Sequence, residues 1–325
     1  MNDSMNDSLD TVVAAFLAHK RALGRKYLTE EATLRLLLAF AAQHGVDDLR
    51  QLTPSLLDEF VVSRPRQRAR NVNHLVSILG CFLDWAVTQQ RLQASPLRRT
   101  RRRETDQRLP FLFDTAQAGQ LLQAAAALGD NPRATGRGPT YHAIFALCYG
   151  LGLRAGEACG LRLGDVDTGR QLLLVRGGKF GKSRLVPHGP RIGELLAHQL
   201  HRRRLEDASD PGAPLFTFDA RRGVHPGSAS QTFHRLVLAL DFPVPDGVTA
   251  PHLHSLRHSF AVGCLLRWYR QGLDPATRLY HLSTFMGHVD PASTAVYLTI
   301  TPQLLAEANR RFEAFAQPAW SEAKR

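Results

Sequence analysis

One arginine-rich stretch limits the folds open to this chain more than any other feature, because it divides the chain in two. Between Ser95 and Pro110 the sequence holds six arginines and almost no apolar side chain before Leu109. So dense a run of like charges is typical of an extended linker and not of a hydrophobic core. The chain has 325 residues, enough for two domains that each have a core of their own. We therefore predict one domain over residues 1–97, a basic linker over 98–110 and a second domain over 111–325.

The first domain carries the apolar pattern of four helices. Apolar side chains recur at helical spacing from Val12 to Leu23, and again on one face from Val72 to Val87. Between these helices, Thr29 is a candidate cap for a second one. The Thr53-Pro54 pair gives a third helix a capping residue followed by a proline in its first turn. We expect this domain to be all helix.

The second domain is predicted to be mainly helical with one small β-hairpin. The runs 171–176 and 184–187 are strand-like and flank the turn sequence GGKFGKS. Asp114 is a candidate helix cap, and further helices are expected over residues 141–149, 154–161, 192–205, 255–268 and 302–316. The predicted fold class is mainly α, with a small β element confined to the second domain.

The charge balance favours a polyanionic partner. The formal net charge is +12 and the isoelectric point is about 10.2, and nucleic acid is the commonest partner for such a surface. A basic protein without such a partner is the alternative that charge alone leaves open. Arginines are concentrated in two clusters, one before the fourth helix and one in the linker. The first cluster either binds phosphate oxygens at the start of that helix or forms a solvated basic loop. The candidate DNA-binding residues are Arg64, Arg66, Arg68, Arg70, Arg98, Arg99, Arg101, Arg102 and Arg103.

Several classes of protein do not fit this sequence. No apolar run approaches the roughly 20 residues needed to cross a bilayer, and the polar, acidic N-terminus is unlike a signal peptide. The four cysteines show neither metal-ligand spacing nor a disulfide framework, so we expect small core residues in a reducing compartment. We predict a cytoplasmic protein that does not bind membranes.

Two places in the second domain carry unusual cations. Arg154 follows a Gly-Leu-Gly break in an apolar setting, where an arginine needs an anionic partner. Glu157 lies three residues further on and can orient Arg154, although a purely structural Arg–Glu pair is the alternative. Lys179 and Lys182 lie at the glycine-rich tip of the hairpin, where lysines are usually solvated. Their spacing does not fit a phosphate-binding Walker loop.

Histidines gather at a third place, HLHSLRHSF. His254 and Arg257 are three residues apart, so they share one face of a helix. The apolar run after His258 predicts a buried, hydrogen-bonded role for that residue. A metal site is the alternative, and the lack of a nearby carboxylate or cysteine weakens it. The fourth place, LSTFMGHVDPASTAVY, pairs His288 with Tyr297, which would ordinarily be a half-buried helical residue.

Taken in chain order, these residues form a specific pattern. An arginine, a hairpin lysine, His-x-x-Arg, Gly-His and a tyrosine nine residues later resemble the ordered active-site motif of the tyrosine recombinases, the phage-integrase-like enzymes of DNA strand exchange. The resemblance extends over nearly the whole chain. It implies the catalytic residues Arg154, Lys179, His254, Arg257, His288 and Tyr297, supported by Glu157 and His258, with Lys182 as a second candidate for the lysine.

The resemblance also implies an architecture and partners. The first domain corresponds to the family's helical, SAM-like core-binding domain and the second to its α+β catalytic domain, and the two form a C-shaped clamp around double-stranded DNA. Family members assemble on DNA as dimers and then tetramers, and use neither a metal nor another cofactor nor ATP. Partner recombinases or accessory proteins are also possible. We expect a nucleoid-associated enzyme of DNA integration, excision or transposition, and the phrase YHLSTFMGHVD resembles transposon-borne members.

The expected chemistry follows from the residue types. Arginines can neutralise a phosphodiester as a fifth oxygen approaches it, and the phenol of Tyr297 must lose its proton to attack. The resemblance places His254 as base or phosphate ligand, His288 as a hydrogen-bond donor and Lys179 as the acid that protonates the departing 5′-oxygen. The product would be a 3′-phosphotyrosyl link. A type IB topoisomerase-like enzyme and a catalytically silent DNA-binding accessory protein are the two alternatives. The spacing from Arg257 to His288 is several residues longer than in compact family members, which affects the helix boundaries between them.

Overall fold

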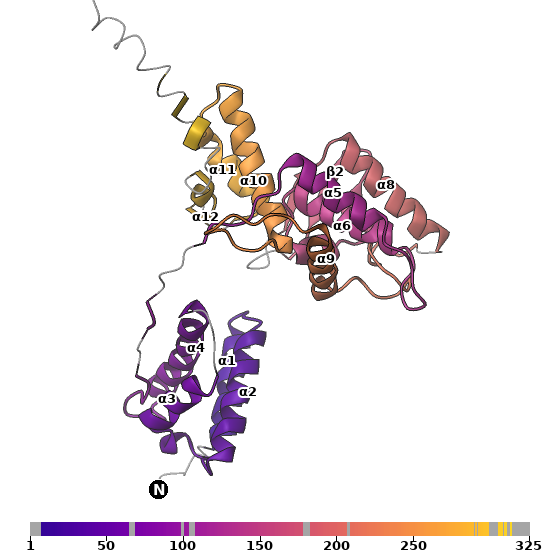
Figure 1. Ribbon diagram of the computed structural model, residues 1–325. Coiled ribbons are helices and arrows are strands. Elements are labelled where there is room, and N and C mark those ends of the chain that lie inside the picture. The colour runs from indigo at the N-terminus through magenta and orange to yellow at the C-terminus, as the bar shows by residue number, and fades with distance from the viewer. Residues whose placement is uncertain are drawn as a thin grey trace, which may run out of the picture. The chain divides into compact units, whose positions relative to one another are not determined.

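The computed structural model describes residues 8–64, 69–98, 101–103, 108–177, 183–206, 209–288, 290, 292–298, 305–307, 309, 310 and 313. The chain divides into two compact units, Met1–Gln107 and Arg108–Arg325, which are coloured from indigo to yellow along the sequence in Figure 1. The division falls within the segment 98–110 that we predicted to be a linker. The fold is mostly helical with one three-stranded sheet, which confirms the predicted fold class.

The first unit contains the four predicted helices. They are α1 (Leu9–Ala22), α2 (Leu28–Gln43), α3 (Pro54–Val62) and α4 (Ala69–Thr88), with a 3-10 turn, η1 (Leu49–Gln51), before α3. Phe16, Phe60 and Phe82 are fully buried where these helices meet, and the rings of Phe16 and Phe82 lie edge to face at 5.4 Å. Burying three phenylalanines in so small a unit supplies much of its stability.

Of the two helix caps predicted in this unit, one is confirmed and the other is wrong. Thr53 caps α3, since its hydroxyl accepts a hydrogen bond of 3.2 Å from the amide of Leu56. The Thr29 cap was wrong, because α2 begins at Leu28 behind Tyr27, which adopts a left-handed conformation with φ +49°. The Tyr27 ring packs edge to face on Phe16 at 5.8 Å, so a tertiary contact and not a capping side chain fixes this helix end.

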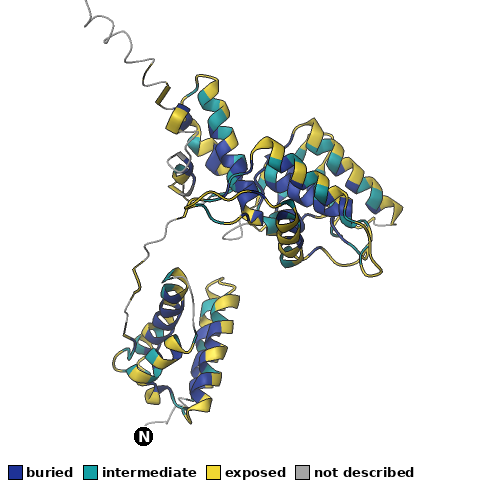
Figure 2. Cartoon of the chain, in the orientation of Figure 1, coloured by how far each residue is buried: buried dark blue, intermediate teal, exposed yellow. Residues whose placement is uncertain are grey.

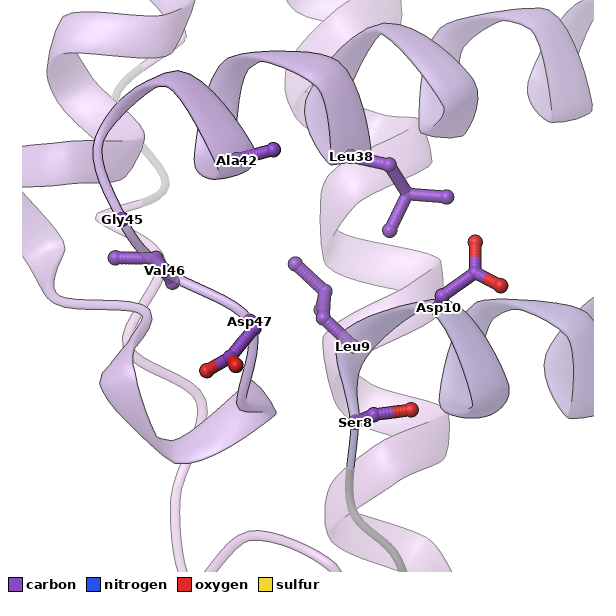
Figure 3. A pocket seen from close by; sticks show the side chains of 8 residues that line it. All are labelled: Ser8, Leu9, Asp10, Leu38, Ala42, Gly45, Val46 and Asp47. Carbon is purple, nitrogen blue, oxygen red and sulfur yellow. The ribbon is translucent and has the colours of Figure 1, made fainter.

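A shallow hollow lies between the start of α1 and the end of α2 (Figure 3). Leu9 and Leu38 point into it from the two helices, and it contains no basic side chain. Its lining residues are Ser8, Leu9, Asp10, Leu38, Ala42, Gly45, Val46 and Asp47. The two carboxylates of Asp10 and Asp47 in this lining do not suit a polyanion.

Between Arg108 and Leu298, the described residues of the second unit form a small sheet and eight helices. The helices are α5 (Thr115–Ala126), α6 (Arg137–Gly150), α7 (Ala155–Cys159), α8 (Pro190–Leu205), α9 (Pro226–Leu240), α10 (Leu253–Arg270), α11 (Pro275–Met286) and α12 (Ala292–Ala295), with 3-10 turns η2 (Leu163–Asp165) and η4 (Val296–Leu298). The antiparallel sheet has the order β1 (Val166–Asp167), β2 (Leu172–Val175), β3 (Arg184–Pro187), and Leu173 pairs with Val186.

The predicted hairpin is therefore confirmed as β2 and β3. The capping role of Asp114 is also confirmed, since its carboxylate accepts a hydrogen bond of 2.8 Å from the amide of Gln117 at the start of α5. Neither β1 nor α9 was predicted from the sequence. The predicted helix over 302–316 lies largely outside the described residues, and Leu305 within it is exposed.

Helix α6 forms the centre of the second unit. Nine of its 14 residues are buried, and the helix contacts α5, α8 and α10. Figure 2 shows the buried faces of these helices in dark blue. A second apolar cluster joins α10 and α11 to η4 and contains Ala261, Val262, Leu265, Leu282, Met286 and Tyr297. Tyr297 is thus held in a packed environment. Within the described residues, no helix is long and apolar enough to cross a membrane.

Candidate active site

The site begins at a forced break between α6 and α7. Gly152 has φ +62°, and a Cβ added there would lie 2.4 Å from the ring of Phe260. Only glycine tolerates both the left-handed backbone and this close approach. The break turns the chain so that Arg154 stands at the start of α7 in extended conformation, which explains the Gly-Leu-Gly-Leu-Arg sequence.

Glu157 on α7 is shared by two arginines. Its carboxylate accepts hydrogen bonds of 2.7 Å from Nη1 of Arg154, and of 3.0 and 2.9 Å from Nη1 and Nη2 of Arg184. A third arginine, Arg257, approaches the same carboxylate to 4.0 Å. Burial alone would raise the pKa of Glu157, but the hydrogen bonds from Arg184 and Arg154 outweigh it and lower the pKa to about 2. One permanent negative charge therefore stands against three positive ones.

The same three arginines also hold the C-terminal end of α11. Nε of Arg184 donates to the carbonyl of Phe285 at 2.9 Å, Nη2 of Arg257 to that of Met286 at 2.8 Å, and Nη2 of Arg154 to that of Gly287 at 3.2 Å. The last carbonyls of a helix have no partner within the helix, and this end carries partial negative charge. The arginines therefore fix the turn that leads directly into His288.

Arg257 is the most deeply buried of the three, with 1% of its side chain exposed. Its Nη1 donates to the carbonyl of Gly152, and burial together with Arg154 lowers its pKa to about 10. Its Nε is buried and has no hydrogen-bond partner among the described residues. A buried guanidinium with an unused donor, next to two more arginines, suits an incoming anion.

Three histidines lie at the N-terminal end of α10, where His252 is the capping residue and His254 and His258 are within the first two turns. The rings of His254 and His258 lie edge to face with centroids 4.7 Å apart, and His252 stacks on His258 at 6.1 Å. Burial, followed by the positive charge of Arg257, lowers the pKa of His254 to about 4, and burial, followed by His254, lowers that of His258 to about 3. Both rings are therefore neutral near pH 7. Among the described residues, no group of three or more His, Cys, Asp or Glu side chains is arranged to hold a metal ion.

Tyr297 lies in η4 with only 4% of its surface exposed. Its hydroxyl is 2.8 Å from Nδ1 of His258, and its ring stacks on that of His288 at 6.5 Å. Burial raises the pKa of Tyr297, whereas the charges of Arg257 and Arg154 act to lower it. His288 in turn bonds the hydroxyl of Thr294 at 2.5 Å, and burial followed by the charge of Arg257 lowers its pKa to about 4.

The structure thus brings together seven of the eight residues predicted for the catalytic site from segments far apart in the sequence. They are Arg154, Glu157, His254, Arg257, His258, His288 and Tyr297. The eighth, Lys179, lies outside the described residues, as do Lys182, Arg66, Arg68 and Arg99.

The remaining predicted DNA-binding arginines belong to the first unit. Arg64 lies over the ring of Phe60 at 5.8 Å, and Arg98 pairs with Asp58 at 3.1 Å. The backbone of Arg102 is tied to the side-chain amide of Asn73 by two hydrogen bonds of 2.8 and 2.9 Å. The side chains of Arg70, Arg98, Arg101, Arg102 and Arg103 are exposed.

Arg184 is the site residue that our sequence analysis missed. It is the first residue of β3, and strand alternation puts it on the same face as buried Val186. An arginine on the inward face of a strand needs a buried anion. The sequence SRLVP therefore contained the signal, since it pairs an inward arginine with the Glu157 already predicted.

Comparisons with a family model and with known proteins both find integrases and recombinases. The phage integrase family matches residues 113–303. A putative integrase/recombinase, y4rB of Sinorhizobium fredii (strain NBRC 101917 / NGR234), is 34% identical and aligns over 93% of this chain and 96% of its own length. The tyrosine recombinase XerC of Xanthomonas campestris pv. campestris is 28% identical over 93% of this chain and 88% of the relative.

Two solved structures resemble the fold. The Tn1549 transposon integrase in complex with transposon right end DNA has a TM-score of 0.64 and 17% identity, and covers 95% of this chain and 99% of its own. A lambda integrase dimer bound to a COC′ core site has a TM-score of 0.63 and 16% identity, and covers 89% and 77% of the two chains. At this level of identity the likeness concerns the fold alone.

Proposed function

The chain belongs to the phage integrase family and is an enzyme of the tyrosine recombinase class, and we propose that it cuts and rejoins DNA strands through a 3′-phosphotyrosyl link to Tyr297. The observation that carries this proposal is the position of the Tyr297 hydroxyl. It is buried and hydrogen-bonded to His258, and it lies within electrostatic reach of Arg257 and Arg154. A solvated surface tyrosine would have none of these features.

The charge of the site supports a phosphodiester as the group attacked. Arg154, Arg184 and Arg257 face the single carboxylate of Glu157, so the cluster holds an excess of positive charge. In a buried site such an excess binds an anion strongly and stabilises the further negative charge that develops on its oxygens in the transition state. The arginines are held in place by α11 and Glu157 before any substrate arrives, which avoids the cost of ordering them during the reaction.

The proposed reaction has two transesterification steps. The Tyr297 hydroxyl gives up its proton to a neighbouring base and its oxygen attacks the phosphorus. The 5′-oxygen leaves with a proton from Lys179, and the phosphate then joins Tyr297 to the 3′-oxygen of the cut strand. A 5′-hydroxyl of a second strand then attacks this link and releases the tyrosine. Because the covalent link conserves the energy of the phosphodiester, the scheme requires neither ATP nor a metal ion.

We propose double-stranded DNA as the substrate, bound by an assembly that grows from a dimer to a tetramer. The net charge of +12 supports this, as do the solved relatives, which include a lambda integrase dimer on a core site and a lambda integrase tetramer on a Holliday junction. Exposed Arg101, Arg102 and Arg103 are proposed to contact the DNA backbone between the two units of a C-shaped clamp. Movement of a mobile element is the role we favour, because the relative with 34% identity is a putative integrase/recombinase.

A two-site recombination assay tests this proposal. DNA sites are first recovered by binding the full-length protein to fragments that flank its own gene, and two copies are then placed on one plasmid. We expect exchange between the sites in the presence of a chelator. Relaxation of the plasmid without exchange would instead indicate a topoisomerase, and binding with neither reaction would indicate a silent accessory protein.

A further inference from the structure

We propose that His258 accepts the proton of the Tyr297 hydroxyl when that oxygen attacks the phosphate, a role for which the family resemblance made His254 the candidate. The inference rests on the proposed function and deepens it, because it names the base of the cleavage step. Among the described residues, His258 is the hydrogen-bond partner of the Tyr297 hydroxyl, with Nδ1 2.8 Å from the oxygen. A general base must lie within hydrogen-bonding distance of the group whose proton it accepts, and His258 meets this requirement.

The surroundings of His258 fix its ring in this orientation. Its centroid lies 4.7 Å from that of His254, 6.1 Å from that of His252 and 5.5 Å from that of Tyr297. Packed among these three rings, the imidazole on α10 has little freedom to turn its Nδ1 away from the phenol. His254 lies behind it and contacts the face or edge of His258, so it supports the ring that touches the nucleophile.

The charges around His258 make it a proton acceptor that responds to substrate. The groups that face it are His252, His254 and Arg257 from α10, His288 from the end of α11, and Tyr297 from η4. Burial, followed by His254 and His252, keeps His258 neutral, so Nδ1 has a free lone pair once the ring proton sits on Nε2. A phosphodiester bound by the arginines would offset their charge and raise the pKa of His258. Proton transfer therefore becomes favourable when the phosphate is in place.

Each bond and proton that is lost during cleavage is matched by one that is gained. The O–H bond of Tyr297 breaks and its proton moves to Nδ1 of His258, while the oxygen forms a bond to phosphorus and the bond from phosphorus to the 5′-oxygen breaks. The departing 5′-oxygen takes a proton from Lys179. In the rejoining step a 5′-hydroxyl gives its proton to Lys179 and its oxygen bonds to phosphorus. The bond from phosphorus to the Tyr297 oxygen breaks, and the imidazolium of His258 returns its proton to that oxygen, so no other reactant is consumed.

A measurement without DNA tests the hydrogen bond itself. In the full chain labelled with ¹⁵N-histidine, we expect Nδ1 of His258 to be unprotonated near pH 7, and its resonance to move when Tyr297→Phe removes the donor. The resonance of exposed His281 on α11 is the control and should not move. A proton on Nδ1 of His258, or a resonance indifferent to Tyr297→Phe, would overturn the proposal.

A pH profile tests the chemical role. Single-turnover cleavage is measured on a nicked substrate built from the recovered site, for the wild type, His258→Phe, His258→Gln and the control His281→Gln. General-base catalysis typically contributes about 10²–10⁴-fold, so both His258 variants should be slower by about that factor at pH 7. The deficit should shrink as pH rises, since ionised Tyr297 needs no base. A reduction in cleavage rate below about threefold would contradict the proposal. A reduction that is the same at every pH between about 6 and 9.5 would also contradict it, because it would show that His258 has only a structural role.

A modified substrate separates base from acid. When sulfur replaces the bridging 5′-oxygen, the departing thiolate needs no proton, so the substrate restores cleavage only to variants that lack the acid. We expect no rescue of His258→Gln, and rescue would overturn the assignment. Should the wild type itself form no covalent product on any substrate, the proposed function fails and not merely this inference. Circular dichroism of each variant checks that it folds, and in a misfolded variant the result of the ¹⁵N-histidine measurement decides.

Discussion

Replacing Glu157 with glutamine should destabilise the second unit strongly while barely changing its shape. The side chain of Glu157 is 6% exposed, and its carboxylate holds Arg184 with two hydrogen bonds and Arg154 with a third. Glutamine keeps the size of the side chain but removes its charge, so three arginines would face one another without an anion. Removing one partner of a buried ion pair commonly costs about 3–5 kcal/mol.

The pKa of Glu157 gives an independent magnitude for the same change. Hydrogen bonds from the two arginines, acting against burial, hold the pKa at about 2, compared with 4.5 for a free glutamate. At about 1.4 kcal/mol for each pKa unit, the ionised carboxylate stabilises the folded state by about 3 kcal/mol. Because the pKa is lowered on folding, this contribution is fully present above pH 4.5 and disappears as the pH falls toward about 2.

The assay must report on the second unit alone. Urea denaturation of the full chain, followed by hydrogen exchange of the α10 peptides in a mass spectrometer, meets that need. We expect Glu157→Gln to lower the free energy of unfolding by about 3 kcal/mol at pH 7, and the difference from wild type to shrink below pH 4.5. Exposed Glu194 on α8 provides the control Glu194→Gln, which should change little. A loss under about 1 kcal/mol, or a difference that persists unchanged at low pH, would contradict this role of Glu157.

Three further predictions concern the glycine turn before α7, the cap of α3 and the exposed linker arginines. Gly152→Ala should lower the free energy of unfolding by about 1–3 kcal/mol in urea, because of φ +62° and the Phe260 ring, whereas Gly156→Ala, where a Cβ meets nothing within 4 Å, should not. Thr53→Ala should destabilise the first unit by about 1 kcal/mol through the lost cap of α3, measured by hydrogen exchange. Replacing Arg101, Arg102 and Arg103 with glutamine should reduce the slope of log affinity against log salt by about 0.9 for each lost phosphate contact, and an unchanged slope would exclude them from the interface.

Local sequence predicted those parts of the fold that local chemistry controls. The Thr53 cap, the Asp114 cap and the β2–β3 hairpin each depend on a few adjacent residues, and each is found. The start of α2 at Leu28 was missed because the packing of Tyr27 on Phe16 determines it. β1 was missed because it has only two residues, and so short a run carries no alternating pattern.

The candidate site shows the same division. Its members, except Arg184, were predicted from the resemblance of their ordered motifs to those of the family, but the partnerships among them depend on tertiary structure. No pattern in the sequence indicated that Arg184, Arg257 and Arg154 would hold the carbonyls of Phe285, Met286 and Gly287, since these pairs lie far apart along the chain. The choice between His254 and His258 as the partner of Tyr297 was likewise beyond sequence spacing, because it depends on how η4 packs on α10.

The nucleophile and the strand end that it captures can both be identified from the covalent protein–DNA product. The full-length protein is incubated with the nicked substrate, digested and examined by mass spectrometry, with Tyr297→Phe as the matched variant. Our account predicts a peptide that contains Tyr297 linked to the 3′-phosphate of the cleaved strand, and no covalent product from Tyr297→Phe. A link to any other residue, a link through a 5′-phosphate, or equal product from Tyr297→Phe would contradict it.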